Sequence, residues 1–308
     1  MLLTKAETAA QPDQPADQGA DRLQLGPDAQ ALILFNPKAG SVNESDRDKL
    51  IAAVTEAGIT RYALVGAEMM SAGLFERAKN FDVIIVLGGD GTANSVLELA
   101  PANAPPIVLL PGGTLNVLPR ALYGELPWPA ALAAALSRGV VRRLAAGTAN
   151  GKPFYIAAIF GATTLLARAR EAVREGDLIK AVSRARHFMK RAFSHRLTAR
   201  PDRKRAKPAE AIGVLCPSFS GTVEGSDLEW VRLETNHLLD LARVSLRAIG
   251  EGWRKDPTIE IARCTHGDIR SSGVIPAVLD GEPKTFLSYV RIAYDPNGPL
   301  VVALPEEV

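Results

Sequence analysis

Cysteine and histidine are scarce in this chain. Its 308 residues include two cysteines, Cys216 and Cys264, and four histidines. None of these residues has the paired spacing of a zinc site. So few cysteines are typical of a protein from a reducing cytosol, where disulfides rarely form. The sequence therefore indicates neither a zinc centre nor a disulfide-stabilised secreted fold.

Long apolar runs are also missing. No segment approaches the roughly 18 uncharged apolar residues of a membrane-spanning helix. Residues 1–29, rich in Ala, Gln, Pro and Asp, lack the basic start and apolar centre of a signal peptide. We expect them to form a disordered tail and the protein to be cytoplasmic. The chain length allows two domains with ample core.

The net charge of +2 conceals an uneven distribution. Residues 168–207 contain 14 Lys/Arg and 4 Asp/Glu. Apolar residues between 178 and 193 recur at helical spacing, which predicts an amphipathic helix with a basic face, followed by a basic loop at 200–207. The basic face is either solvated or docks on anionic lipid headgroups at the inner membrane surface. Aromatic residues are not interleaved with the basic ones, which argues against nucleic acid binding. A homodimer is compatible with the sequence.

Strands alternate with helices in the first half of the chain. Apolar runs predict strands at residues 31–35, 62–65, 83–87 and 107–110. Helices are predicted at residues 74–80, 92–100 and 129–136, and another after Ser45, with Asp48 completing a capping box and Gly58 ending the helix. We assign residues 30–139 to a doubly wound parallel-sheet domain that binds a nucleotide.

From residue 140 onward the pattern changes to short apolar runs separated by turns. These runs cover residues 140–144, 153–160, 211–216, 228–233, 258–263, 273–279, 285–294 and 300–304. They predict a mainly antiparallel β-sandwich over residues 140–305, with the basic helix and a helix at 237–249 inserted. The last strand is free to return to the first domain.

Three of the predicted strands end in polar, glycine-containing loops. The loops are Asn36–Ser41, Gly88–Thr92 and Gly112–Asn116. Ligands of open parallel sheets bind outside the carboxyl ends of the strands. Glycine allows close approach of the backbone, and the N-terminus of the following helix favours a phosphate. Asp90 would repel that phosphate without a cation, so a Mg²⁺ nucleotide is the expected ligand.

Four motifs follow one another in a specific order. They are Asn36-Pro37-x-x-Gly40, Gly88-Gly89-Asp90-Gly91-Thr92, Pro111-x-Gly113-Thr114-x-Asn116 and Leu279-Asp280-Gly281-Glu282-Pro283. This set resembles the diacylglycerol kinase catalytic family, in particular the soluble bacterial lipid kinases related to sphingosine and ceramide kinases. The resemblance extends over residues 31–305. It implies that ATP and a lipid meet in a cleft between the two domains.

The resemblance also implies roles for individual residues. ATP would be held by the first three motifs, through Asn36, Pro37, Gly40, Gly88, Gly89, Asp90, Gly91, Thr92, Gly112, Gly113, Thr114 and Asn116. Asp90 would organise Mg²⁺ directly or through water, and Asp227 is a second metal candidate. Our hypothesis is that Glu282 accepts the proton of the lipid hydroxyl while Asp280 supports the metal or water network. Asp90 is the alternative base, because sphingosine kinases place theirs in the Gly-Asp-Gly loop.

The chain departs from the family at three places. Val117 stands where an Asp is usual, and the segment 159–164 lacks the family's acidic residue. The acidic loop that binds a structural Mg²⁺ in some members corresponds at best to residues 224–228, with altered spacing. We expect an ATP- and Mg²⁺-dependent lipid kinase, with diacylglycerol as the first acceptor and sphingoid bases, ceramide or other glycerolipids open. The departures motivate an alternative, a catalytically impaired nucleotide- or lipid-binding regulator. NAD kinases share Gly-Gly-Asp-Gly, but their other motifs are missing here. A dehydrogenase is excluded because no G-x-G-x-x-G follows a strand.

Overall fold

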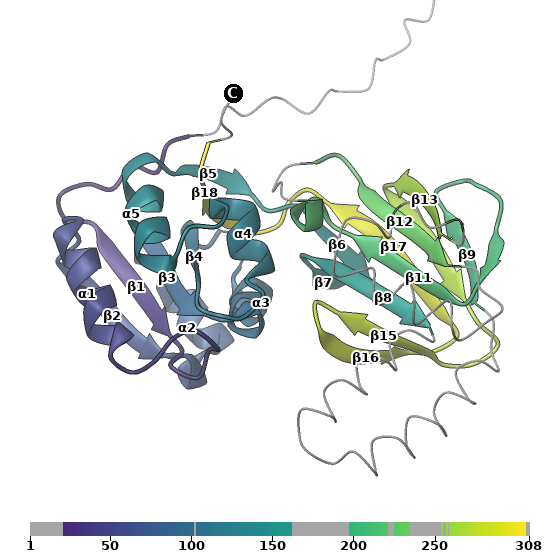
Figure 1. Cartoon of the computed structure of the whole chain (residues 1–308), viewed down its shortest axis with the longest axis horizontal. Coiled ribbons are helices and arrows are strands. Elements are labelled where there is room, and N and C mark those ends of the chain that lie inside the picture. The colour runs from purple at the N-terminus through teal and green to yellow at the C-terminus, as the bar shows by residue number, and fades with distance from the viewer. Residues whose placement is uncertain are drawn as a thin grey trace, which may run out of the picture.

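The computed structural model describes residues 21–101, 103–161, 197–220, 225–233, 254, 257 and 259–305. It consists of an α/β lobe and a lobe made mainly of β-strands (Figure 1). The α/β lobe contains one six-stranded sheet, and the second lobe contains two further six-stranded sheets. A mixed α/β architecture with one parallel-containing sheet and two antiparallel sheets is therefore confirmed.

The sheet of the α/β lobe has the strand order β2-β1-β3-β4-β18-β5. Its strands are β1 (Gln30–Phe35), β2 (Arg61–Gly66), β3 (Val83–Gly88), β4 (Ile107–Pro111), β5 (Val140–Arg143) and β18 (Leu300–Ala303). All pairs are parallel except β18 with β5. Every residue of β3 is buried, as expected for a central parallel strand with both faces covered.

The helices of this lobe follow the strands in sequence. They are α1 (Asp46–Glu56), α2 (Ala72–Ala78), α3 (Asp90–Leu99), α4 (Val117–Tyr123) and α5 (Trp128–Arg138), with a 3₁₀ turn η1 (Ala67–Met69) after β2. Helix α1 packs against α5, and α3 packs against α4. Helix α4 was not predicted, because it has only seven residues and contains Pro119, which a first helical turn tolerates.

The start of α1 differs from the prediction. Ser45 precedes the helix, but its side chain makes no capping bond to the helix backbone. The hydroxyl of Ser45 instead donates to Oδ1 of Asn43, and the carboxylate of Asp46 accepts from the Asn43 N–H at 3.0 Å. The expected capping box with Asp48 is therefore replaced by a turn that Asn43 and Asp46 stabilise. Gly58 follows the helix with a φ of 94°, as a helix-ending glycine does.

The second lobe is built from two antiparallel sheets. One has the order β10-β9-β14-β17-β6-β7, and the other β13-β12-β11-β8-β15-β16. The first comprises β6 (Ala146–Ala149), β7 (Lys152–Phe154), β9 (Leu197–Pro201), β10 (Lys207–Ala209), β14 (His266–Arg270) and β17 (Tyr289–Asp295). The second comprises β8 (Ala157–Gly161), β11 (Ala211–Leu215), β12 (Leu228–Leu233), β13 (Ile259–Cys264), β15 (Ile275–Leu279) and β16 (Glu282–Phe286), with a 3₁₀ turn η2 (Pro217–Ser220) after β11. A single cluster that includes Trp230, Phe160 and Ile292 draws buried side chains from both sheets.

Several predicted boundaries in this lobe change. The runs at 153–160 and 285–294 each divide into two strands, and β6, β9, β10 and β14 were not predicted. The expected basic loop at 200–207 includes the end of β9 and the turn into β10, which pair antiparallel. The expected helices at 178–193 and 237–249 lie outside the described residues.

The two ends of the chain contribute to the α/β lobe. The backbone N–H of Leu23 donates to the Gly139 carbonyl at 2.9 Å, and Arg22 forms a bridge with Val140. Residues 21–29, which we assigned to the tail, thus contact the α/β lobe, and residues 1–20 lie outside the described part. Strand β18 returns to the first sheet between β4 and β5.

Candidate functional site

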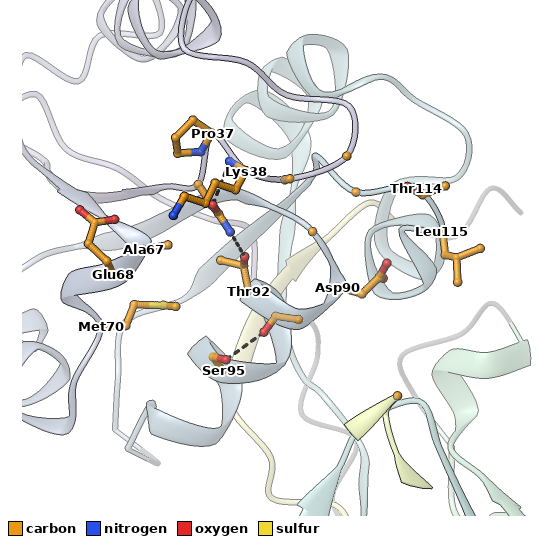
Figure 2. A pocket seen from close by; sticks show the side chains of 17 residues that line it. Pro37, Lys38, Ala67, Glu68, Met70, Asp90, Thr92, Ser95, Thr114 and Leu115 are labelled. Atoms are coloured by element: carbon orange, nitrogen blue, oxygen red, sulfur yellow. Dashed lines mark hydrogen bonds between the residues drawn. The ribbon is translucent and has the colours of Figure 1, made fainter. Parts of the chain in front are cut away.

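A cavity of about 1120 Å³ lies at the carboxyl ends of the parallel strands. Figure 2 shows its lining. The lining residues are Asn36, Pro37, Lys38, Ala39, Gly40, Ala67, Glu68, Met70, Gly89, Asp90, Gly91, Thr92, Ser95, Gly113, Thr114, Leu115 and Gly281. The three glycine loops and one residue of the second lobe thus meet at one cavity.

The middle loop leads directly from β3 into α3. Gly89 precedes the helix in an extended conformation and Asp90 is its first residue. The first backbone N–H groups of a helix have no partner within the helix. Together with the helix dipole they favour an anion, so the start of α3 is suited to a phosphate group.

The carboxylate of Asp90 joins the middle loop to the third. Its Oδ2 accepts from the backbone N–H of Asn116 at 3.0 Å, and its Oδ1 accepts from Val117 at 2.8 Å. Asp90 therefore caps the N-terminus of α4. Each carboxylate oxygen keeps acceptor capacity beyond its one bond, which a cation or a bound water could use.

The first loop is hydrogen-bonded to both of the others. The side-chain amide of Asn36 donates to Oγ1 of Thr92 at 2.8 Å (Figure 2). The backbone N–H of Ser41 donates to the Gly112 carbonyl at 3.0 Å, and its hydroxyl donates to the Gly113 carbonyl at 3.2 Å. The three loops are thus interlocked and held in fixed relation to one another.

Close backbone packing explains two of the glycines. A Cβ on Gly112 would lie 2.7 Å from Cγ2 of Val42 and 2.8 Å from the Gly88 carbonyl oxygen. A Cβ on Gly113 would lie 2.9 Å from the Cα of Gly89. These distances are below normal contact, so a side chain at either position would force the loops apart.

Three of the predicted nucleotide-site residues support the cavity and do not line it. They are Gly88, Gly112 and Asn116. Asn116 has a left-handed φ of 50°, and its side-chain oxygen accepts from the Gly113 N–H at 2.7 Å. The other residues predicted to hold ATP line the cavity.

The second lobe reaches the cavity through the turn between β15 and β16. Leu279 pairs with Glu282, so Asp280 and Gly281 form a two-residue hairpin turn. Both have positive φ, 48° for Asp280 and 89° for Gly281, as an Asp-Gly turn of type I′ requires. Of the motif residues 279–283, Gly281 alone lines the cavity.

The carboxylate of Asp280 points away from the cavity into its own lobe. It accepts from three successive backbone N–H groups, those of Tyr155 at 2.6 Å and of Ile156 and Ala157 at 2.9 Å. Burial raises the pKa of Asp280, although these three bonds act in the opposite direction. The structure thus places Asp280 as a support for the hairpin turn, separate from Asp90.

One residue of the site was missed at the sequence level. Asn94 lies on α3 and is buried, and its side-chain amide donates to the Asp280 carbonyl at 3.2 Å. The hydroxyl of Tyr155 donates to the Leu97 carbonyl at 3.1 Å. These two bonds connect α3, which carries the middle loop at its start, with the lobe that supplies Gly281. Neither contact has a sequence signal, because both join segments far apart in the chain.

The remaining acidic candidates lie outside the cavity lining. Glu282 is exposed and pairs with Lys284 at 2.8 Å. Asp227 pairs with Arg263 at 2.9 Å. Among the described residues no group of three His, Cys, Asp or Glu side chains could hold a metal ion. Mg²⁺ usually retains waters and needs only one or two carboxylates beside phosphate oxygens, so Asp90 at the cavity wall fits that requirement.

Several cavity residues were not among the predicted ligands. Besides Gly281 of the second lobe, they are Lys38, Ala39, Ala67, Glu68, Met70, Ser95 and Leu115. Lys38 and Leu115 lie inside motifs already identified, at positions the motifs leave variable. Glu68 and Met70 follow β2, whose carboxyl end lies at the same sheet edge, and this position is the signal that could have revealed them.

The cavity-bearing part of the chain matches a known family. Residues 30–149 match the model of the diacylglycerol kinase catalytic domain. A diacylglycerol kinase of Bacillus subtilis (strain 168) is 33% identical over 132 residues, which are 40% of this chain and 43% of that protein. A diacylglycerol kinase of Staphylococcus aureus (strain JH9) is 33% identical over 99 residues, 30% of this chain and 31% of that protein. The chain thus matches less than half the length of these relatives.

Solved structures share the fold of nearly the whole chain. A diacylglycerol kinase from Bacillus anthracis str. Sterne aligns with a TM-score of 0.66 at 16% identity, covering 91% of this chain and 98% of that one. An NAD kinase from Archaeoglobus fulgidus in complex with ATP aligns with a TM-score of 0.52 at 13% identity, covering 88% and 92%. At these identities the similarity concerns the fold. The resemblance to the diacylglycerol kinase catalytic family, expected from the motifs, is confirmed.

No helix in the described part of the chain is long and apolar enough to cross a membrane.

Proposed function

Because residues 30–149 match the diacylglycerol kinase catalytic domain, we propose that this chain is an ATP- and Mg²⁺-dependent lipid kinase. It transfers the terminal phosphoryl group of ATP to a lipid hydroxyl, with diacylglycerol as the first acceptor to test. The observation that carries the proposal is the cavity at the sheet edge, where three interlocked glycine loops face Gly281 of the second lobe. Sphingoid bases, ceramide and other glycerolipids are the further acceptors to compare.

The α/β lobe supplies a binding site for the phosphates. Backbone N–H groups at the start of α3 and the glycines of the three loops allow phosphate oxygens to approach the main chain closely. Lys38 at the cavity wall adds a positive charge. Asp90 would hold Mg²⁺ directly or through water, and the cation would neutralise charge on the phosphates during transfer.

Glu282 is the residue proposed to accept the proton. The lipid hydroxyl loses its proton as its oxygen bonds to the terminal phosphorus and ADP leaves. Asp280 is less suited, because its carboxylate already accepts three backbone hydrogen bonds inside its own lobe. Glu282 follows Gly281 directly, and among the described residues its carboxylate is engaged only by the half-buried Lys284.

An assay with a panel of acceptors tests the proposal. Purified protein is incubated with labelled ATP and Mg²⁺, and with diacylglycerol, sphingosine, ceramide or NAD, the lipids being presented in mixed micelles. We expect label on a lipid, and on diacylglycerol first. Label on NAD and on no lipid would overturn the lipid kinase proposal in favour of the NAD kinase activity that shares this fold. ATP binding without transfer to any acceptor would favour the alternative function, a catalytically impaired nucleotide- or lipid-binding regulator.

Peripheral membrane contact is proposed for the basic segment at residues 168–207. Most of it lies outside the described residues. In the described part, Arg200 pairs with Asp268 at 2.6 Å and Lys207 with Glu260 at 2.7 Å, so these two charges are partly neutralised by neighbours. Sedimentation with vesicles tests the contact: binding should require anionic lipid and weaken as salt rises. Binding indifferent to both would contradict it.

A further inference from the structure

The cavity extends past the glycine loops to the end of β2. Ala67, Glu68 and Met70 line it there, and none of them belongs to a motif of the sequence. Figure 2 shows Glu68 and Met70 on the opposite side of the cavity from Asp90 and Leu115. The cavity thus has a phosphate-binding part and a second part with different chemistry.

The carboxylate of Glu68 lies in the space that a side chain on Gly66 would occupy. A methyl group on Gly66 would overlap the carboxylate of Glu68, so the glutamate folds back over that position. Gly66 has a φ of −69° and a ψ of 150°, which any residue adopts. Glycine is therefore needed here for space and not for its backbone conformation.

The carboxylate of Glu68 accepts no hydrogen bond and forms no ion pair with the residues that the structure describes. An ionised carboxylate is purely an acceptor of hydrogen bonds. It would repel a phosphate, so the phosphates are expected at the start of α3, with Lys38 lying between that helix and Glu68 (Figure 2). A ligand group at the Glu68 end must donate hydrogen bonds.

The ribose of a nucleotide supplies such a group. Its 2′ and 3′ hydroxyls are adjacent donors, and a single carboxylate can accept from both. In dinucleotide-binding sheets an acidic side chain downstream of the glycine-rich turn accepts a hydrogen bond from the ribose 2′ hydroxyl. Glu68 stands two residues beyond β2, the second strand in the chain and the neighbour of β1 in the sheet.

We propose that Glu68 accepts hydrogen bonds from the ribose hydroxyls of the bound nucleotide and so selects ribonucleotides over deoxyribonucleotides. The inference rests on the proposed nucleotide site and names a residue outside its motifs. The triphosphate then extends from Glu68 past Lys38 to the start of α3, with its terminal phosphate toward Gly281.

Calorimetric titration with ADP and with 2′-deoxy-ADP, both with Mg²⁺, tests this directly. The wild-type protein should bind ADP about tenfold more tightly, the usual effect of one hydrogen bond to a charged group. Glu68→Ala loses the bonds to both hydroxyls, so it should bind ADP at least as weakly as the wild type binds 2′-deoxy-ADP, and it should lose the preference between the two nucleotides. Gly66→Ala keeps the carboxylate but displaces it, and should also reduce the preference. Glu44→Ala, which removes an exposed carboxylate that does not line the cavity, should behave as wild type.

The outcomes separate the two proposals. Equal binding of ADP and 2′-deoxy-ADP by the wild type, or an unchanged preference in both Glu68→Ala and Gly66→Ala, would overturn the role of Glu68 and leave the ATP site standing. Failure of the wild type to bind ADP at all would overturn the nucleotide site itself and this inference with it. Thermal melting of each variant verifies that it is folded.

Discussion

The carboxylate of Asp90 accepts a hydrogen bond of 2.8 Å from the backbone N–H of Val117, the first residue of α4. The family usually has an Asp where this chain has Val117. Because the donor is the backbone, the bond forms with either side chain at that position. This departure therefore leaves the link between the second and third glycine loops intact.

Substitution of Asp90 should separate its structural role from its charge. Asp90→Ala removes both bonds to the start of α4 and should lower the free energy of unfolding by about 1 kcal/mol, as the loss of a helix cap does. Asp90→Asn keeps one acceptor oxygen and should cost less stability. Both variants should lose phosphoryl transfer, because neither can organise Mg²⁺. Urea denaturation and the transfer assay measure the two effects, and wild-type transfer by Asp90→Asn would rule out a need for the charge.

The ion pair between Glu282 and Lys284 offers a matched test of the proposed base. Glu282→Gln and Lys284→Gln break the same exposed pair, so each should change the free energy of unfolding by less than about 1 kcal/mol. Glu282→Gln should abolish transfer to the lipid, while Lys284→Gln should retain it. Full transfer by Glu282→Gln would remove Glu282 from the role of base. Equal loss of phosphoryl transfer in both variants would show that transfer needs the ion pair, and would not support Glu282 as the base.

Asp280 should matter for stability through its three backbone hydrogen bonds. Asp280→Asn replaces one acceptor oxygen with an amide donor, which leaves at least one buried backbone N–H without a partner and should cost about 1–3 kcal/mol. As a control, Asp227→Asn breaks a pair with the largely exposed Arg263 and should cost less than about 1 kcal/mol. Urea denaturation of both variants measures the difference. Equal and small losses would contradict the supporting role of Asp280.

Asp268 should make stability depend on acidic pH. Hydrogen bonds from the Tyr289 hydroxyl and from Arg200 lower the pKa of Asp268 below its usual value of 3.8. The folded state therefore binds fewer protons, so the stabilisation is present above pH 3.8 and is lost as pH falls through the lower folded pKa. Asp268→Asn should reduce stability by about 1 kcal/mol at pH 7 and progressively less below pH 3.8. Denaturation at a series of pH values checks this, and an equal loss at all pH values would contradict the assignment.

The α/β lobe was largely predictable because its signals are local. Buried parallel strands give continuous apolar runs, and their polar carboxyl ends marked the three loops that line the cavity. Helix α4 was missed because it is short and follows Asn116, whose left-handed conformation a sequence pattern does not reveal. The role of Asn94 depends on its hydrogen bond to Asp280, which lies 186 positions further along the chain. Such contacts follow from the packing of the two lobes, which local patterns do not encode.

The second lobe was predicted in class but not in detail. Its strands are short, and the runs at 153–160 and 285–294 had no turn residues strong enough to indicate where each divides. The sequence placed Asp280 and Gly281 between two predicted strands, but it did not indicate that the carboxylate of Asp280 would be directed to Tyr155. The side-chain direction at a hairpin turn is set by tertiary hydrogen bonds.

Phosphoryl transfer from labelled ATP to diacylglycerol, measured side by side for the wild type and Glu282→Gln, tests the central claim most directly. We predict labelled lipid with the wild type in the presence of Mg²⁺ and none with the variant, whose thermal melting should match that of the wild type. Absence of label on diacylglycerol and on every other lipid of the panel, from a folded wild-type protein that binds ATP, would contradict the account.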